Sequence, residues 1–324
     1  MKARNTRVIV AIAAMGALLL TAAVAMAGTF IGTDQPEILR GTRLADTMDA
    51  KGGNDRVIGR GGDDQIDLGQ GDDRGFGGRG NDTMYGGDGN DRMHGNQGND
   101  TLDGQVGNDR IWGGLGDDTI LGHQGGDLLV GGAGNDTIQG DVPNAGDLVS
   151  RDRIFGGSGD DNLQGGDGRD IIHGGSGNDT SVGNGGNDLM FGGAGDDNQN
   201  GGPGNDRIFA NEGVDTTNGG EGNDDLWALS PKDVHPGPNG EVDTVGDTLD
   251  GGAGNDRFHT RDGEVDHITC ADGYDVALLD TVDVITDATA QNPNGSCEKV
   301  VRKAPGRNAG EPSGGRDPKE PADS

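Results

Sequence analysis

The segment from residue 77 to residue 85 reads Gly77-Gly78-Arg79-Gly80-Asn81-Asp82-Thr83-Met84-Tyr85, and residues 131 to 139 read Gly131-Gly132-Ala133-Gly134-Asn135-Asp136-Thr137-Ile138-Gln139. Both are copies of one nine-residue unit, with glycine at positions 1, 2 and 4 and aspartate at position 6. Aspartate recurs at this spacing from Asp46 to Asp136, resumes from Asp152 to Asp224, and returns at Asp247, Asp256, Asp266 and Asp275. Such repetition predicts a stack of small repeated units rather than an ordinary globular domain.

The residue types divide each unit into a turn and a strand. Glycine accepts positive φ angles, so we expect positions 1 to 6 to turn tightly. Positions 7 to 9 then form a three-residue strand whose side chains alternate, which points position 8 inward. Position 8 of the aspartate-bearing units is apolar except at Gly75, Ser181, Gln199 and Thr217. We therefore expect a core one side chain thick, least stable where the last three exceptions follow one another.

The units alternate in type, so the period is eighteen residues rather than nine. Every second unit carries mostly arginine at position 7 and an aromatic or aliphatic residue at position 9, whereas the others carry mostly threonine, asparagine or glutamine at position 7. This alternation predicts two opposed parallel sheets with different outward faces. It continues in phase across residues 137 to 151, which therefore hold an insertion of seven residues in one turn.

The pattern resembles the RTX-type, or hemolysin-type, calcium-binding nonapeptide repeat family, over roughly residues 32 to 280. The resemblance implies an all-β fold, a right-handed parallel β-roll (β-solenoid) of 18-residue coils with two short-strand sheets and calcium-binding turns. It also implies that each ion lies between turns of successive coils, held by position-6 carboxylates and by carbonyl oxygens around positions 2 and 4. Large toxins and hydrolases of this family carry a catalytic domain, whereas this chain is similar to a free-standing repeat protein.

Stacked coils would place one position-6 aspartate over the next, and two such carboxylates repel by about 1 kcal/mol even in water. Calcium takes about six to eight oxygen ligands, whereas magnesium holds its waters and zinc prefers Cys and His. We expect on the order of ten to twenty Ca²⁺ ions, although a single aspartate could instead make a local turn hydrogen bond. Asp55, Asp215 and Asp266 follow irregular turns and are left out. The predicted ligands are Asp64, Asp73, Asp82, Asp91, Asp100, Asp109, Asp118, Asp127, Asp136, Asp152, Asp161, Asp170, Asp179, Asp188, Asp197, Asp206, Asp224 and Asp256.

The composition supports a partner that is a cation. The 324 residues include 56 Asp and Glu against 25 Lys and Arg, a formal charge of -31, with 30% hydrophobic residues. This leaves two alternatives, a disordered acidic chain or a repeat fold whose charge is neutralised by a ligand. Nucleic acid is excluded as a natural partner because its phosphates would be repelled. We expect an unstructured chain without calcium and a compact β-rich form with it.

Residues 1–27 are predicted to be a cleaved signal peptide. Lys2, Arg4 and Arg7 precede an uncharged apolar run, and Ala25-Met26-Ala27 fits a small-x-small cleavage site. The alternative is an uncleaved membrane anchor, because the run approaches spanning length. After cleavage no membrane span is expected, and the predicted localisation is secreted.

The remaining chain divides by how regular the repeat is. We expect an N-terminal cap with degenerate repeats at 28–49, the β-roll at 50–259 with insertions near 141–151 and 228–241, and C-terminal repeats with a cap at 260–302. Residues 303–324 are rich in proline, glycine and charge, and they predict a disordered tail. Cys270 and Cys297 predict a disulfide in an exported protein, with two buried thiols as the alternative.

The sequence favours a protein that is not an enzyme. It lacks a His-Glu-x-x-His motif, and Ser158 and Ser176 lie in turns without the second half of a nucleophile elbow. We predict an extracellular structural scaffold. The alternative is an adhesion module for a cell-surface glycan or protein, although the rings could simply stack on one another. The face for that alternative consists of Arg74, Phe76, Arg110, Trp112, Arg153, Phe155, Phe191, Arg207, Phe209 and Trp227.

Overall fold

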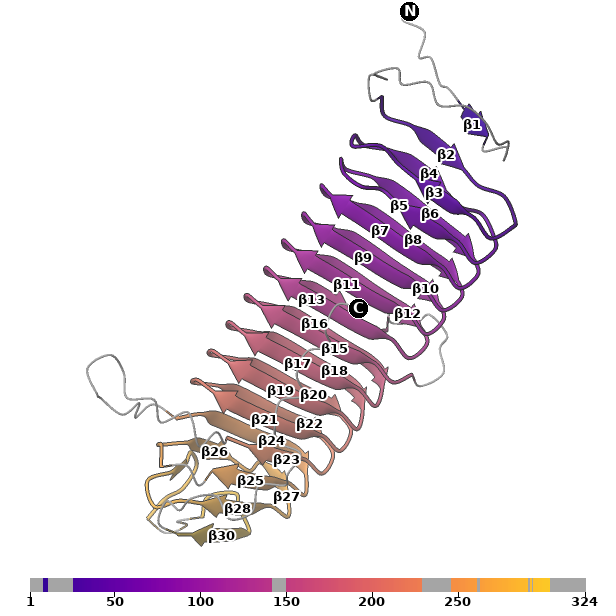
Figure 1. The fold of residues 1–324 in the computed structure, drawn as a ribbon. Helices are drawn as coiled ribbons and strands as arrows, with labels where there is room; N and C mark the ends of the chain where they lie inside the picture. The colour runs from indigo at the N-terminus through magenta and orange to yellow at the C-terminus, as the bar shows by residue number, and fades with distance from the viewer. Residues whose placement is uncertain are drawn as a thin grey trace, which may run out of the picture. The chain divides into compact units, whose positions relative to one another are not determined.

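The computed structural model describes residues 8–10, 26–141, 150–228, 246–260, 263–290, 292 and 294–303. The chain divides into two compact units, Met1–Ala133 and Gly134–Ser324, and each is a parallel β-solenoid (Figure 1). The predicted β-roll at 50–259 is thus shared between both units. Most of the predicted signal peptide, the centres of both insertions (142–149 and 229–245) and the predicted tail from residue 304 lie outside the described residues. The described residues contain no helix with the length and apolarity needed to cross a bilayer.

Unit 1 contains two parallel sheets, which we call the Thr sheet and the Arg sheet after their position-7 residues. The Thr sheet consists of β2 (Thr29–Ile31), β4 (Thr47–Asp49), β6 (Gln65–Gln70), β8 (Thr83–Asp88), β10 (Thr101–Val106) and β12 (Thr119–Gln124). β1 (Val8–Val10), within the predicted signal peptide, pairs with β2. The Arg sheet consists of β3 (Ile38–Arg40), β5 (Arg56–Ile58), β7 (Arg74–Arg79), β9 (Arg92–Gln97), β11 (Arg110–Leu115) and β13 (Leu128–Ala133).

Unit 2 repeats this arrangement. Its Thr sheet consists of β14 (Thr137–Gln139), β16 (Asn162–Gly168), β18 (Thr180–Gly186), β20 (Asn198–Pro203), β22 (Thr216–Glu221), β24 (Thr248–Gly254), β26 (His267–Thr269) and β29 (Val284–Ile285), with β27 (Asp272–Gly273) also paired to β24. Its Arg sheet consists of β15 (Arg153–Ser158), β17 (Ile171–Ser176), β19 (Leu189–Ala194), β21 (Arg207–Glu212), β23 (Asp225–Trp227), β25 (Arg257–Thr260), β28 (Val276–Leu279) and β30 (Lys299–Arg302).

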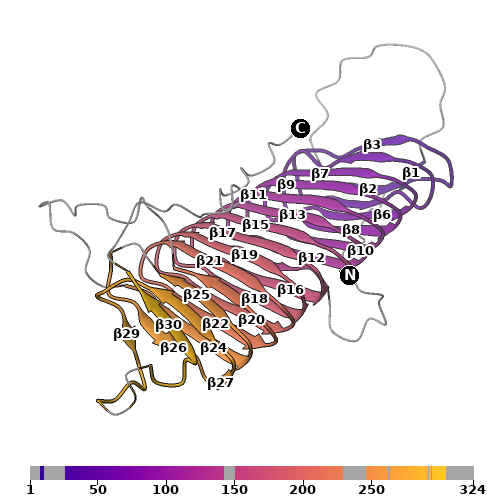
Figure 2. The same cartoon turned by 90° about the horizontal axis from the view of Figure 1, so that it is seen from below.

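The strands follow the predicted eighteen-residue coil. In the Thr sheet Leu102 is in register with Met84, and in the Arg sheet Ile111 is in register with Met93. Figure 2 shows β6, β8 and β10 in one layer and β7, β9 and β11 in the other. Consecutive units of the sequence therefore alternate between the sheets, which confirms the predicted parallel solenoid.

The core lies between the two layers and is built from position 8. Met84, Met93, Leu102 and Ile111 have 0% exposure. The polar exceptions Ser181, Gln199 and Thr217 are buried in neighbouring strands of the unit 2 Thr sheet. Position 8 therefore fills the interior, and position 1, which also faces inward, is mostly glycine but adds Leu68 in β6.

The strands are longer than the sequence predicted. β8 and most of its neighbours contain six residues, positions 7 to 9 of one unit followed by positions 1 to 3 of the next. Only end strands and those beside insertions, such as β14 and β23, keep the expected three residues. The glycine at position 2 has positive φ, as at Gly87 with φ 103°, yet remains within the ladder. Glycine-rich positions therefore extend the strand instead of ending it, and the turn shrinks to positions 4 to 6.

We predict that Thr217→Val stabilises unit 2. The Thr217 hydroxyl is buried without a hydrogen-bond partner, and valine replaces it with a methyl group of the same shape. Removing such an orphaned polar group should raise the free energy of unfolding by about 1–2 kcal/mol. Thr216→Val on the exposed face of the same strand is the control and should give no comparable gain. Calcium-saturated thermal melts of both variants measure this, and a lower melting temperature for Thr217→Val would contradict it.

The C-terminal part of unit 2 contains the predicted disulfide between Cys270 and Cys297, whose residues are 0% and 3% exposed. The bond closes a segment with a sequence separation of 27. In the chain-entropy account, a loop of this length contributes roughly 3–4 kcal/mol. We expect the Cys270→Ala/Cys297→Ala variant to lose that stability and to exchange amide hydrogens faster in β28 and β30. Equal protection in the variant and the natural chain would show that the disulfide is not needed.

Candidate metal sites

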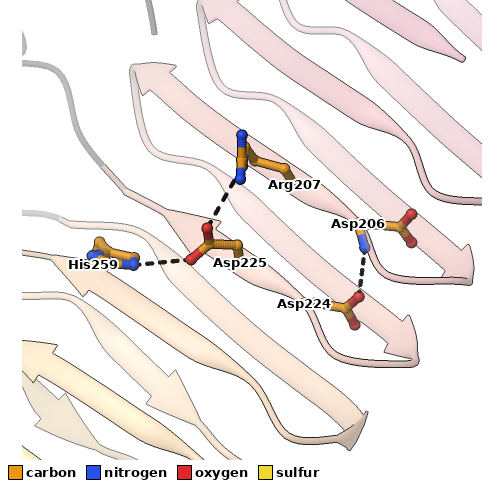
Figure 3. Close-up of polar contacts among 5 residues, drawn as sticks. All are labelled: Asp206, Arg207, Asp224, Asp225 and His259. Carbon is orange, nitrogen blue, oxygen red and sulfur yellow. Dashed lines mark hydrogen bonds and ion pairs between the residues drawn. The ribbon is translucent and has the colours of Figure 1, made fainter. Parts of the chain in front are cut away.

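The position-6 aspartates form ladders along the turns that join the sheets. The amide of Asp73 donates to Oδ1 of Asp91, and the amide of Asp91 donates to Oδ1 of Asp109, both at 2.8 Å. In unit 2 the amide of Asp206 donates to Oδ1 of Asp224 at 2.8 Å (Figure 3). All of the predicted ligands lie in these ladders, and none is more than 3% exposed. Each carboxylate is therefore fixed in place through one of its oxygens.

The other carboxylate oxygen is buried without a donor in most of these residues. Oδ2 of Asp73, Asp91 and Asp109 has no hydrogen-bond partner. A buried oxygen of an ionised carboxylate that lacks a donor is costly unless a cation neutralises it. The same is true of Oδ2 in Asp55, Asp64, Asp82, Asp100, Asp161, Asp170, Asp179, Asp188, Asp197, Asp206, Asp215, Asp224, Asp256 and Asp275.

In units with glycine at position 1, a carbonyl oxygen from the next coil lies beside this Oδ2, and the missing side chain leaves the space between the two oxygens open. The unit of Asp73 instead carries Leu68 at position 1. A β-carbon at Gly86 would lie 2.7 Å from Asp91 Oδ2 and 2.5 Å from the Gly104 carbonyl oxygen. In unit 2 the corresponding distances from Gly165 are 2.6 Å to Asp170 Oδ2 and 2.7 Å to the Gly183 carbonyl oxygen. Carboxylate and carbonyl oxygens are the ligands that calcium takes in proteins. The residues present therefore fit calcium.

Burial dominates the electrostatics of the ladder. It raises the pKa of Asp64 to about 7 and that of Asp109 to about 8. The amide of Asp46, which donates to Asp64, lowers the pKa of that carboxyl, and the neighbouring Asp82 raises it again to a smaller degree. Repulsion between stacked carboxylates, which the sequence argument emphasised, is thus the lesser cause. The sites need a cation mainly because the carboxylates have lost their water.

Comparison with protein families gives the same assignment. The model of the RTX calcium-binding nonapeptide repeat matches residues 40–75, 69–102, 94–129, 121–141, 150–181, 173–202, 191–226 and 246–264, which together make up more than half of the chain. The chain belongs to the RTX calcium-binding nonapeptide repeat family. It is therefore a calcium-binding repeat protein, and the resemblance stated from the sequence is confirmed. No curated protein matches the chain in sequence.

The first turns of this RTX solenoid differ from its interior turns. Oδ2 of Asp46 accepts the amide of Thr42 at 2.5 Å, and Oδ1 of Asp46 accepts the amide of Gly28 at 2.6 Å. Glu37 likewise accepts the amide of Thr33 in its own turn. These carboxylates have protein donors where the interior ones have none. The predicted ligand set does not include Asp46.

Two aspartates omitted from that set have the interior environment. Asp55 accepts the Glu37 amide at 2.7 Å and Asp215 accepts the Asp197 amide at 2.7 Å, and both leave Oδ2 buried without a partner. Asp55 and Asp215 were not among the predicted ligands because the turn residues before them depart from the repeat. Their unbroken nine-residue phase was the signal that identifies them, and we add both to the candidate RTX sites.

Position 5 forms a second ladder that was not predicted from the sequence. The amide of Asn90 donates to Oδ1 of Asp72 at 2.9 Å, and the amide of Asn108 donates to Oδ1 of Asn90 at 3.0 Å. This ladder runs opposite to the position-6 ladder, because each side chain accepts from the coil that follows it. These hydrogen bonds connect the outer edges of turns in neighbouring coils. The recurrence of Asn or Asp immediately before the repeat aspartate was the available signal.

The aromatic side chains of the Arg sheet stack on one another. In unit 1 the ring centroids are 5.2 Å apart for Phe76 and His94 and 4.6 Å apart for His94 and Trp112. In unit 2 a longer stack contains Phe155, His173, Phe191, Phe209, Trp227 and His259. Among the predicted face residues, the rings of Trp112, Phe155, Phe191, Phe209 and Trp227 are only 1–8% exposed. The rings therefore cover one another, which is the stacking considered from the sequence, whereas Arg74, Arg110, Arg153 and Arg207 are exposed.

Within the described part of the chain, no three His, Cys, Asp or Glu side chains converge as a metal site. The candidate RTX sites instead combine one carboxylate with carbonyl oxygens of the backbone, as described above for Asp91 and Gly104. They recur along both edges of each unit rather than forming one centre.

Proposed function

We propose that this protein is secreted, folds when it binds calcium, and acts as an extracellular structural scaffold. The observation that carries this proposal is the row of buried Oδ2 atoms without donors, which at turns such as those of Asp91 and Asp170 lie beside a carbonyl oxygen of the next coil. One ion between two coils would satisfy both groups and join the coils. On the order of ten to twenty such ions would bind along the chain.

The balance between core and charge supports folding on calcium. The interior of each unit is one side chain thick, and its position-6 carboxylates are buried in the folded form. In the unfolded chain the same carboxylates are hydrated, so burying them ionised and without an ion opposes folding. Binding energy at sites that exist only in the folded form then becomes folding energy.

Two features support export from the cell. The first is the predicted signal peptide at residues 1–27, and the second is the disulfide between Cys270 and Cys297. Disulfides persist in oxidising compartments outside the cytosol. Calcium is plentiful there, so a chain exported unfolded would order after it leaves the cell.

Stacking among the aromatic rings of the Arg sheet supports a scaffold role. Stacked rings such as Phe191 and Phe209, 5.0 Å apart, stabilise the sheet through cross-strand contact. These rings therefore strengthen the solenoid itself rather than offering their faces to a ligand.

The proposal is tested by titrating calcium into the calcium-free mature chain at pH 8 while the far-UV circular dichroism signal is recorded. We expect a cooperative gain of β signal with calcium and little gain with magnesium. Asp91→Asn should shift the midpoint to higher calcium, whereas Asp46→Asn, at a carboxylate with two protein donors, should not. No β signal at millimolar calcium would refute folding on calcium. Protein retained in the cytoplasm of its host would refute secretion.

A further inference from the structure

The position-6 ladder of the last coils in unit 2 ends at the Cys270–Cys297 disulfide. The amide of Asp256 donates to Oδ1 of Asp275 at 2.9 Å, and the amide of Asp275 donates to Oε2 of Glu298 at 2.8 Å. Glu298 directly follows Cys297 in the sequence, so the disulfide adjoins the last carboxylate of this ladder. Both Cys297 and Glu298 lie beyond residue 264, where the match to the repeat family ends. The nonapeptide repeat therefore does not account for either residue.

Cys270 lies in the coil that follows the turn of Asp256. The registers of β24 with β26 and with β27 place Cys270 opposite Gly251. A β-carbon at Gly251 would lie 2.6 Å from Asp256 Oδ2, which is buried without a hydrogen-bond partner. In the turn of Asp91 the neighbouring coil contributes a carbonyl oxygen from this same position. The candidate site at Asp256 is the last of its ladder, because Asp275 is not among the candidate RTX sites and has cysteine instead of glycine at position 1.

The disulfide is accessible only if the segment that contains Cys297 moves away from the coil of Cys270. Cys270 is 0% exposed and Cys297 is 3% exposed. The amide of Ala271 donates to Ser296 Oγ at 3.1 Å, and β30 pairs with β28 just after the disulfide. Opening of this segment therefore exposes the sulfur atoms and withdraws Glu298 from the end of the ladder at the same time.

We propose that the calcium ion at Asp256 and the Cys270–Cys297 disulfide stabilise each other, which makes the last candidate site of this ladder sensitive to reduction. The ion fixes the coil that contains Cys270 and so keeps the disulfide covered. The disulfide holds Glu298 in the ladder and so keeps that coil on the ion. If calcium binds the disulfide form more tightly than the reduced form, it opposes reduction by the same factor. The inference rests on the calcium-dependent folding proposed above.

A dithiol reduces such a bond in two steps. One thiolate attacks Sγ of Cys297, the more exposed of the two cysteines, and the S–S bond breaks with Cys270 as the leaving thiolate. The second thiolate of the reductant then displaces Cys297, which also leaves as a thiolate. The protein gains two electrons and the dithiol becomes a disulfide. Because the first attack requires the opening described above, its rate measures how often the segment opens.

The test follows the reduction of the calcium-saturated full chain by dithiothreitol at pH 8, with the released thiols counted by alkylation. Asp256→Asn keeps an acceptor oxygen for the ladder hydrogen bond but weakens calcium binding at this turn, and we expect reduction at least about tenfold faster. Asp275→Asn, nearer to the disulfide but outside the candidate RTX sites, is the matched control. It should change the rate less than about twofold, as should Asp91→Asn in unit 1. In an equilibrated dithiothreitol redox buffer, the reduced-to-oxidised ratio of Asp256→Asn should be at least about fivefold higher than that of the natural chain.

Equal reduction of the natural chain and Asp256→Asn would overturn the inference. So would an equal acceleration by Asp275→Asn, which would make the effect a loss of packing instead of a loss of calcium, or by Asp91→Asn, which would make it a property of the whole fold. Circular dichroism of the same samples keeps the two proposals apart. A chain that gains β signal with calcium but shows equal reduction fails only this inference, whereas a chain that gains none fails the proposed function as well.

Discussion

Calcium-free protein, which we expect to be unfolded at pH 8, should gain β structure when the pH is lowered to 5. Burial raises the pKa of Asp64 to about 7, of Asp109 to about 8 and of Asp197 to about 8. At pH values between the ordinary carboxyl pKa and these raised values, the folded form holds protons on these carboxyl groups. The unfolded chain, whose carboxyl pKa values are ordinary, has released them. Stability from these protons is fully present below the unfolded pKa near 3.8 and is lost as the pH rises through about 6 to 8.

The size of the effect follows from the number of ladder residues that titrate together. We expect the calcium-free protein to show little β signal at pH 8 and a larger β signal, with a measurable thermal transition, at pH 5. With saturating calcium at pH 8 the ion takes the place of the proton, so the fold should persist, and calcium affinity should fall as the pH is lowered. Melts of dialysed protein at several pH values measure this. A calcium-free protein with no more β signal at pH 5 than at pH 8 would contradict the assignment of the buried carboxylates.

Gly86→Ala should weaken the calcium site at Asp91 and destabilise unit 1 by about 1–3 kcal/mol. The φ angle at Gly86 is not in the positive range, so alanine is not excluded by the backbone. Its β-carbon would instead lie 2.7 Å from Asp91 Oδ2 and 2.5 Å from the Gly104 carbonyl oxygen. It would therefore occupy the space in which those two oxygens meet.

Gly61→Ala is the matched control, because its β-carbon would meet only Arg79 atoms at 3.5 and 3.6 Å, which is ordinary contact. We expect this variant to keep its calcium stoichiometry and its melting temperature within a few degrees. Calcium binding and thermal unfolding of the two variants give the comparison. If Gly86→Ala bound calcium as tightly as the natural chain and melted at the same temperature, the space beside Asp91 would not be a calcium site.

The spacing of a few residue types was sufficient to predict the architecture. The nine-residue recurrence of aspartate and the alternation of arginine and threonine at position 7 predicted two parallel sheets with position 8 inside. Met84 and Met93, on opposite sheets, confirm this through their complete burial. The strand length was predicted wrongly, because glycine is normally a turn residue, while here Gly86 and Gly87 remain in β8.

The residues of the candidate sites could be predicted from the sequence, but the hydrogen bonding of their carboxylate oxygens could not. Position 6 identified the ladder, yet the sequence alone does not show that Oδ1 accepts an amide while Oδ2 lacks a donor, as in Asp91. Nor does it separate Asp46, whose Oδ2 accepts from Thr42, from the interior aspartates. Both distinctions depend on where backbone N–H groups point. The burial of rings such as Trp112 also follows from stacking across strands, which becomes visible only once the register is known.

The central claim is that calcium ions neutralise the buried carboxylate ladder of both units. Equilibrium dialysis of the mature chain at pH 8, followed by elemental analysis of calcium and protein in the same sample, tests it most directly. We predict on the order of ten to twenty ions per chain, lost together with the β signal when a chelator is added. A folded protein that retained its β signal with no more than one or two ions per chain would contradict the account.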